Sequence, residues 1–173
     1  MLYTIKKGKH YCQWTLPQFH FHATGFKIRF SFDQSCLYSR TEMGQEWADL
    51  NKLYGISLGL RHHKNSFRIA WRANDDHIEL FSYWYDDGVL HYEKLSDVSV
   101  EKEYAIVVDL TDTKASVTLF DKNAIKYEYS RVVYNKSGRT KNFIGYVLRP
   151  YFGGTLPAPK DMSINIYKAI IKK

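Results

Sequence analysis

The sequence predicts an all-β protein, a two-sheet antiparallel β-sandwich with one short helix. Hydrophobic residues alternate with polar residues at period two along most of the chain, and this is the pattern of half-buried strands. Turn residues separate these alternating runs. The runs are too many for one sheet, so two packed sheets are favoured. We expect a single domain over residues 1–173, because no linker or repeat interrupts the pattern.

The clearest strand covers residues 25–32, where Phe26, Ile28, Phe30 and Phe32 share one face. The same alternation predicts further strands at 55–61, 66–72, 77–85, 89–95, 104–110, 115–121, 125–133, 144–152 and 162–171. Between two of them, the run Asp86-Asp87-Gly88 is a hairpin signal, because Asp-Gly tolerates the positive φ of tight turns. Similar breaks stand at 63–65, 74–76, 111–113 and 121–123, so the strands form an antiparallel meander.

One segment departs from period two. Ser39 and Glu42 have the spacing of a capping box, and Met43, Trp47, Leu50 and Tyr54 follow at helical intervals. This pattern predicts about three turns of helix near residues 40–52.

The charge balance favours anionic partners. Lys and Arg number 25 against 18 Asp and Glu, which gives a net charge of +7. The aromatic content of 16% with only 4 Pro excludes a disordered chain. We see no signal peptide and no membrane span, so we expect a cytoplasmic location and no membrane partner. Cys12 and Cys36 are expected as free thiols rather than as a disulfide.

The candidate site is the sheet face that points away from the core. If Phe67, Ile69 and Trp71 point inward, Arg68 and Arg72 point outward together. The same argument on other strands, with Tyr146 and Leu148 taken as inward, completes a set of candidate ligand-binding residues: Arg61, His63, Arg68, Arg72, Glu79, Tyr83, Tyr85, Arg149 and Tyr151.

Guanidinium groups and tyrosine rings suit a polar, anionic, chain-like ligand. Guanidinium forks pair with carboxylates or phosphates, whereas flat rings stack on sugars or bases. The plain alternative is a solvated face on which Arg and Glu pair with one another. A polar basic loop at 135–142 adds positive charge that nucleic acid would also favour.

Other chemistries find weaker support. His10, Cys12, His20 and His22 are zinc-ligand types, but no CxxC or HExxH spacing is present, so no metal is expected. Gly153-Gly154 lacks the lysine of a phosphate-binding loop, and no G-x-S-x-G motif occurs. We therefore expect no cofactor.

Two segments, 54–72 and the run Arg149-Pro150-Tyr151-Phe152-Gly153-Gly154, look like parts of small bacterial sandwich proteins. With its many antiparallel strands, the chain resembles the jelly-roll sandwich of the concanavalin A-like lectins and glucanases. The resemblance implies that fold. The paired carboxylates of the glucanases are missing, since Glu79 stands alone.

Alginate-lyase-like members of the superfamily use Arg, Gln, His and Tyr on the concave face. Gln18-Phe19-His20 is similar to their Q-I-H motif but lies too early in the chain, and their R-x-E-L-R strand is missing. No catalytic residue is assigned on this basis. A polysaccharide lyase that uses Arg68, Arg72, His63 and Tyr83 is a chemically consistent alternative.

The leading hypothesis is a non-catalytic, lectin-like module that binds an acidic or neutral glycan through the Arg/Tyr face. Nucleic-acid or nucleotide binding by the same basic face is the second hypothesis. A lyase is the third. The fourth is a structural or protein-interaction protein, in which an oligomer buries the tyrosine-rich face.

Overall fold

The computed structural model of the protein describes residues 1–13, 16–121, 124–132 and 144–172. Its strands are β1 (Leu2–Ile5), β2 (Phe19–Phe21), β3 (Gly25–Phe32), β4 (Asn51–Ser57), β5 (Ser66–Asn74), β6 (His77–Asp86), β7 (Val89–Val98), β8 (Tyr104–Leu110), β9 (Lys114–Asp121), β10 (Ala124–Val132), β11 (Ile144–Leu148) and β12 (Met162–Lys172). Helix α1 (Arg40–Met43) is flanked by the 3-10 turns η1 (Gln34–Cys36) and η2 (Gly44–Ala48).

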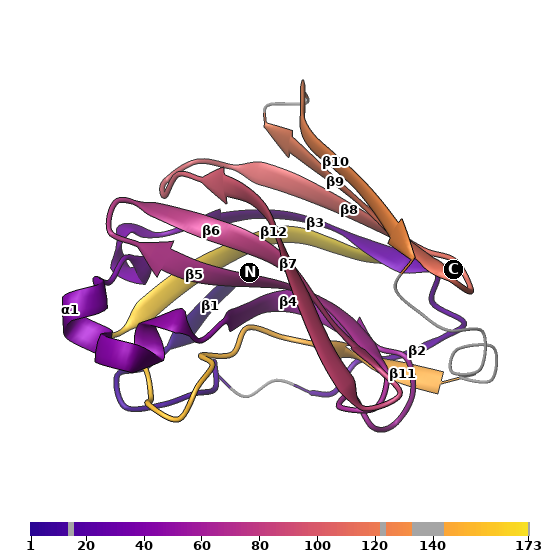
Figure 1. The fold of residues 1–173 in the computed structure, drawn as a ribbon, viewed down its shortest axis with the longest axis horizontal. Helices are drawn as coiled ribbons and strands as arrows, with labels where there is room; N and C mark the ends of the chain where they lie inside the picture. The colour runs from indigo at the N-terminus through magenta and orange to yellow at the C-terminus, as the bar shows by residue number, and fades with distance from the viewer. Residues whose placement is uncertain (14–15, 122–123, 133–143, 173) are drawn as a thin grey trace.

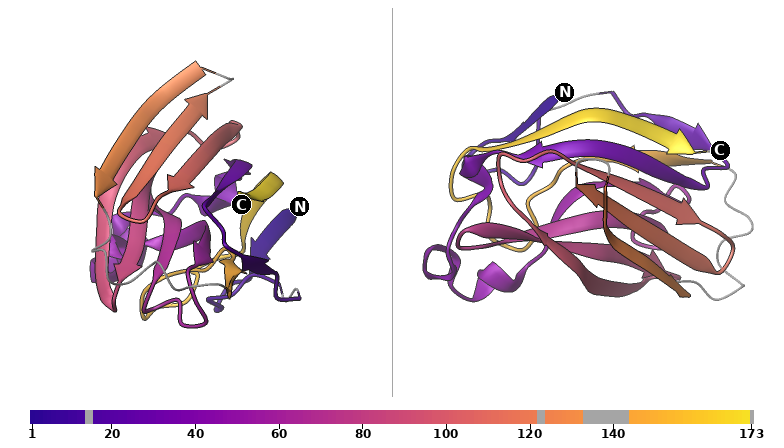
Figure 2. Two further views of the ribbon diagram at one scale, coloured as in Figure 1. Left: turned by 90° about the vertical axis from the view of Figure 1, so that its right-hand side faces the viewer. Right: turned by 90° about the horizontal axis from the view of Figure 1, so that it is seen from above.

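The strands form two 6-stranded antiparallel sheets. The first sheet has the order β1-β12-β3-β8-β9-β10, and the second has the order β2-β11-β4-β5-β6-β7. Figures 1 and 2 show the two sheets as the layers of a sandwich, with α1 at one end. The predicted fold class, an all-β two-sheet sandwich with one short helix, is confirmed for the described residues.

The core lies between the two sheets. The even-numbered residues of β3, from Phe26 to Phe32, are at most 1% exposed, and the odd-numbered residues of β5 face them. The rings of Phe32 and Trp71 are 5.1 Å apart, and those of Phe26 and Tyr54 are 5.4 Å apart. Period two therefore sorts β3 and β5 as predicted, and the opposite face of β5 turns away from the core.

The best turn prediction is also confirmed. Asp87 has φ 47° and Gly88 has φ 89° in the hairpin that joins β6 to β7. Two consecutive positive φ values are the geometry that the Asp-Gly pair predicts. Long strands bounded by such turns are therefore recovered closely, and β3 and β8 have the predicted bounds.

The predicted helix at 40–52 is too long. The capping box is present, with Ser39 Oγ accepting from Glu42 N, but the α-helix ends at Met43 because Gly44 adopts φ 59°. Leu50 and Tyr54 belong to a strand region instead, since β4 begins at Asn51. These two apolar residues match helical spacing by coincidence. Both faces of β4 are buried, so its apolar residues do not alternate with polar ones.

The strand predicted at 55–61 is also displaced, because burial on both faces of β4 hides the alternation that would mark where the strand begins. β4 runs from Asn51 to Ser57, and Leu60, which falls within the predicted strand, is 67% exposed in the connection that follows. The short strands β1 and β2 were not predicted at all, because segments of 4 and 3 residues carry too few alternations.

In β11, the side chain predicted to face the core faces the other way. The strand ends at Leu148 rather than at residue 152, and Val147 joins the core between the sheets. Tyr146, predicted to point inward, therefore lies on the opposite face, and its hydroxyl meets His62 there. Arg149 and Tyr151 follow the strand end, so alternation along a strand does not determine where they point.

Cys12 and Cys36 are free thiols, as expected. The basic loop at 135–142 lies outside the described residues. Within the described residues, no helix is long and apolar enough to cross a membrane.

Candidate functional site

A cavity of about 760 Å³ opens on the face of the second sheet that points away from the core. Its wall is formed by Tyr11, Cys12, Gln13, Pro17, Lys52, His62, His63, Arg68, Tyr83, Tyr85, Tyr146, Val147, Leu148, Arg149, Pro150 and Tyr151. No Asp or Glu occurs among these described residues, whereas Arg, Lys and His are all present. The cavity therefore carries positive charge with no carboxylate in its wall.

Strand pairing places the central side chains of the cavity. Arg68 on β5 is paired with Gly55 on β4 and with Tyr83 on β6, so the three lie in one row across the sheet. Tyr85 lies two residues beyond Tyr83 and points to the same side. Tyr83 also packs with Phe81 in a small apolar cluster, so part of this face is packed rather than solvated.

Arg68 is the most unusual group in the cavity. Its residue is 9% exposed, and its Nε has no hydrogen-bond partner among the described residues. Burial lowers the pKa of the guanidinium to about 10, an effect that nearby tyrosines such as Tyr83 partly oppose. A buried cation without a counter-ion is costly, so the site gains free energy when an anion pairs with it.

Lys52 lies beside Arg68. Its Nζ donates to the Leu50 carbonyl oxygen at 2.5 Å and lies 4.5 Å from the centre of the Tyr83 ring. Burial, together with the charge of Arg68, lowers the pKa of Lys52 to about 8. The ammonium is therefore charged at neutral pH but close to its titration range.

Two histidines from the connection between β4 and β5 line the cavity. His62 Nδ1 lies 2.6 Å from the Tyr146 hydroxyl, and either group can donate. Burial, then the charges of Arg68 and His63, lower the pKa of His62 to about 4, so its imidazole is neutral at pH 7. The His63 ring packs against the Tyr85 ring at 5.2 Å. The neutral His62 can accept a proton.

The structure brings most of the predicted site residues together. His63, Arg68, Tyr83, Tyr85, Arg149 and Tyr151 all line the cavity. Arg61 does not, because it lies exposed in the connection after β4. Arg72 and Glu79 are also outside the cavity wall.

Arg72 and Glu79 pair with each other. Arg72 Nε and Nη2 donate to Glu79 Oε2 at 2.8 and 2.6 Å, and Lys94 donates to Glu79 Oε1 at 2.8 Å. Trp47 packs against the Arg72 guanidinium, 4.2 Å from the ring centre. The contacts of Arg72 and Glu79 therefore fit the plain alternative, in which Arg and Glu on this face pair with one another and bind no ligand.

Sequence reasoning did not place Tyr11, Lys52, His62 or Tyr146 in the site. Lys52 fell in the predicted helix, His62 follows the end of the predicted strand at 55–61, and Tyr146 was assigned to the core. Tyr11 belongs to a segment without periodicity, so no strand pattern could place it. These four residues are far apart in the sequence, and only tertiary packing brings them to one cavity.

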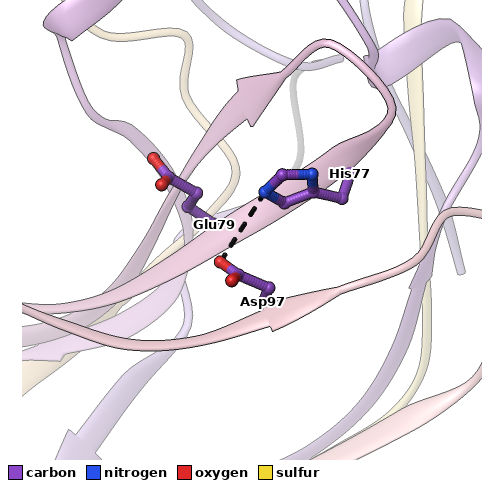
Figure 3. A group of neighbouring side chains, drawn as sticks. All are labelled: His77, Glu79 and Asp97. Carbon is purple, nitrogen blue, oxygen red and sulfur yellow. Dashed lines mark ion pairs between the residues drawn. The ribbon is translucent and has the colours of Figure 1, made fainter.

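The zinc-type residues are not assembled into a site. Within the described part of the chain, the only group of three potential ligands is His77, Glu79 and Asp97, shown in Figure 3. Lys94 Nζ lies 2.8 Å from Glu79 and 2.9 Å from Asp97, and Arg72 brings a second positive charge to Glu79, so two cations already pair with the two carboxylates. These contacts fit an ion-pair network better than a metal centre.

Comparisons with known proteins identify the fold. The chain matches no family model and no curated protein. Among solved structures, it is similar to an alginate lyase from Klebsiella pneumoniae, with a TM-score of 0.58 and 10% identity over 85% of this chain. It spans only 59% of that enzyme.

Two further alginate lyases show the same likeness. An exolytic PL7 enzyme from Zobellia galactanivorans has a TM-score of 0.61 and 6% identity, covering 90% of this chain and 76% of the enzyme. A PL-14 enzyme from Aplysia kurodai has a TM-score of 0.53 and 12% identity, covering 98% of this chain and 82% of the enzyme. The expected jelly-roll sandwich fold is therefore confirmed.

Proposed function

We propose that the protein binds an acidic glycan, a chain that carries uronate carboxylates, in the cavity on the second sheet. The observation that carries this proposal is the buried guanidinium of Arg68, which has an unpartnered Nε in a cavity wall free of Asp and Glu. A carboxylate at Arg68 would supply the missing counter-ion. Lys52 would provide a second positive charge beside it.

The tyrosines favour a sugar chain over a small inorganic anion. Tyr83, Tyr85, Tyr146 and Tyr151 surround the cations with rings and hydroxyls. Such rings can pack against sugar faces, while their hydroxyls exchange hydrogen bonds with sugar hydroxyls. The cavity of about 760 Å³ has the size of an oligomer site rather than of a single ion. The fold that the chain shares with alginate lyases supports a glycan ligand as well.

Binding is tested by calorimetry with alginate, polygalacturonate and heparin, alongside neutral glucans and single-stranded DNA. We expect measurable affinity for uronate chains, and we expect Arg68→Ala to weaken it at least tenfold. Arg29→Ala is the matched control, because Arg29 lies on the first sheet and pairs with Glu103. Equal binding by the two variants contradicts the proposal, and a preference for DNA favours the nucleic-acid hypothesis instead.

A second candidate function is cleavage of the same glycan by β-elimination. The observation that favours it is the contact of neutral His62 with Tyr146 beside the cations. A base would take the proton from C5 of the uronate, the C4–O bond would break, and an acid would return a proton to the leaving oxygen. Arg68 would stabilise the charge that develops on the carboxylate.

Cleavage is distinguished from binding by its product. β-Elimination leaves a C4–C5 double bond at the new non-reducing end, and this group absorbs ultraviolet light. We expect His62→Gln to abolish the appearance of that absorbance while leaving affinity within about threefold, because Arg68 is retained. If no product forms from any uronate chain that binds, the non-catalytic function stands alone.

A further inference from the structure

A second cavity, of about 430 Å³, adjoins the first. Thr4, Lys6 and Lys9 line it together with Tyr11, Cys12 and Gln13, and the last three residues also line the first cavity. Segment 11–13 is therefore a boundary that both cavities share. A ligand longer than the first cavity can reach the second by passing over this boundary.

The shared segment is held in place by β1 on one side and by Tyr151 on the other. Cys12 forms a β-bridge with Ile5 of β1, and Tyr11 forms one with Tyr151. The Gln13 side chain accepts from Thr4 N at 2.7 Å and donates to the Leu2 carbonyl at 2.6 Å. A segment fixed in this way loses little conformational freedom when a ligand binds to it.

Tyr11 stands exposed on this fixed segment. It is 71% exposed, and the Tyr11 and Tyr151 rings are in edge contact with centres 5.2 Å apart. Tyr151 in turn stacks on the His10 ring at 5.6 Å. The group forms an aromatic ridge between the two cavities. An exposed, supported ring is a stacking surface for a sugar.

The charge in the second cavity is carried by Lys9. Lys6 also lines the cavity, but its Nζ pairs with Asp161 Oδ2 at 2.7 Å. Lys9 has no ion-pair partner within the described part of the chain. Positive charge in a wall without carboxylates is thus followed, past the aromatic ridge, by the positive charge of Lys9.

We propose that the second cavity is an outer subsite for the same acidic chain, with Tyr11 stacking on a sugar ring and Lys9 pairing with a carboxylate. This inference rests on the proposed function. It adds a direction, because the chain would leave the Arg68 cavity over Tyr11 toward β1. It also predicts that affinity rises with chain length beyond what the first cavity holds.

The test is calorimetry with size-fractionated oligomannuronates and oligogalacturonates, from the dimer to the octamer. We expect wild-type affinity to rise with length, and we expect Lys9→Ala and Tyr11→Ala each to weaken octamer binding about tenfold. Lys9→Ala should not alter dimer binding more than about twofold, because a dimer would occupy only the Arg68 cavity, which Lys9 does not line. Lys7→Ala is the matched control, since it removes the same charge but Lys7 does not line either cavity.

The outcomes separate the two proposals. If wild type binds short and long oligomers equally, or if Lys9→Ala behaves as Lys7→Ala does with the octamer, the outer subsite is wrong while the acidic-glycan function survives. If wild type binds no oligomer of either kind, both proposals fail. A loss of dimer binding in Lys9→Ala would also overturn the subsite, because it would show that Lys9 acts on a ligand confined to the first cavity.

Discussion

The side chain of Arg68 lies directly against the backbone of Gly55 on the neighbouring strand. A β-carbon at position 55 would clash with the Phe67 carbonyl oxygen and would come within 2.6 Å of Arg68 Cγ. Gly55 lies opposite Arg68 in the β4–β5 pairing, so the missing side chain leaves the space that the Arg68 stem occupies. The position of the cavity's central cation therefore depends on a glycine of another strand.

We expect Gly55→Ala to move Arg68 and to weaken acidic-glycan binding about tenfold or more. Overpacking of this kind also lowers the free energy of unfolding, by about 1–3 kcal/mol. Calorimetry and urea unfolding measure the two effects. Gly88→Ala is the control, because Gly88 has φ 89° and no atom near its missing β-carbon. It should lose stability through backbone strain yet bind normally. Normal binding by Gly55→Ala would show that Arg68 does not need this space.

Lys52 should make glycan binding depend on alkaline pH. Its folded-state pKa of about 8 lies below the usual lysine value because of burial and the charge of Arg68. The ammonium is charged below that pKa and is lost as pH rises through it. An anionic ligand binds the charged form better, so we expect affinity to fall from about pH 8 upward.

The control for this pH dependence is Lys52→Arg, because a guanidinium keeps its charge across this range. We expect the variant to bind the same uronate chain with an affinity that changes little between neutral pH and about pH 9. Titration calorimetry at a series of pH values gives both curves. Identical slopes for wild type and variant would exclude Lys52 as the titrating group.

The contrast between Arg68 and Tyr146 explains how far the sequence predicts this site. Arg68 lies within a long strand with clean alternation, so its outward direction follows from period two alone. Tyr146 lies on a strand of 5 residues, where one misjudged position reverses every side chain. Fold class and the long strands could therefore be predicted, but the short strands could not.

Which residues come together in the cavity could be predicted even less. Tyr11 and Lys52 meet the cavity through bridges to Tyr151, which are contacts between segments far apart in the sequence. Arg72 shows a different limit. The sequence predicts which face of the sheet Arg72 lies on, but it does not reveal that Glu79 is its ion-pair partner. Only the β5–β6 register, in which Arg72 lies opposite Glu79, makes that pair visible.

Arg72 should matter for stability and not for binding. Its guanidinium donates twice to Glu79, which is 6% exposed, and both lie outside the cavity wall. In Arg72→Ala, the Glu79 carboxylate keeps its ion pair with Lys94 but loses the one with Arg72. We expect the free energy of unfolding to fall by about 1–3 kcal/mol, measured with urea, while uronate affinity stays within about twofold. A large loss of affinity in a folded variant would place Arg72 in the binding site after all.

Acid should destabilise the protein through two histidines. Burial lowers the pKa of His20, whose two ring nitrogens have no hydrogen-bond partner among the described residues. Burial also lowers the pKa of His62, to about 4. Both rings are therefore neutral in the folded state at pH values where the unfolded chain already binds protons. Their contribution to stability is complete above the unfolded pKa of about 6.5 and is lost as pH falls below it.

Urea unfolding from pH 7 to about pH 4 tests this sign. We expect His20→Gln and His62→Gln each to show a shallower loss of stability with acid than wild type, because each removes one group that protonates on unfolding. His91→Gln, an exposed position on β7, is the control and should keep the wild-type slope. A wild-type slope in both buried-site variants would mean that carboxylates alone set the acid sensitivity, since the histidines would then bind protons equally in both states.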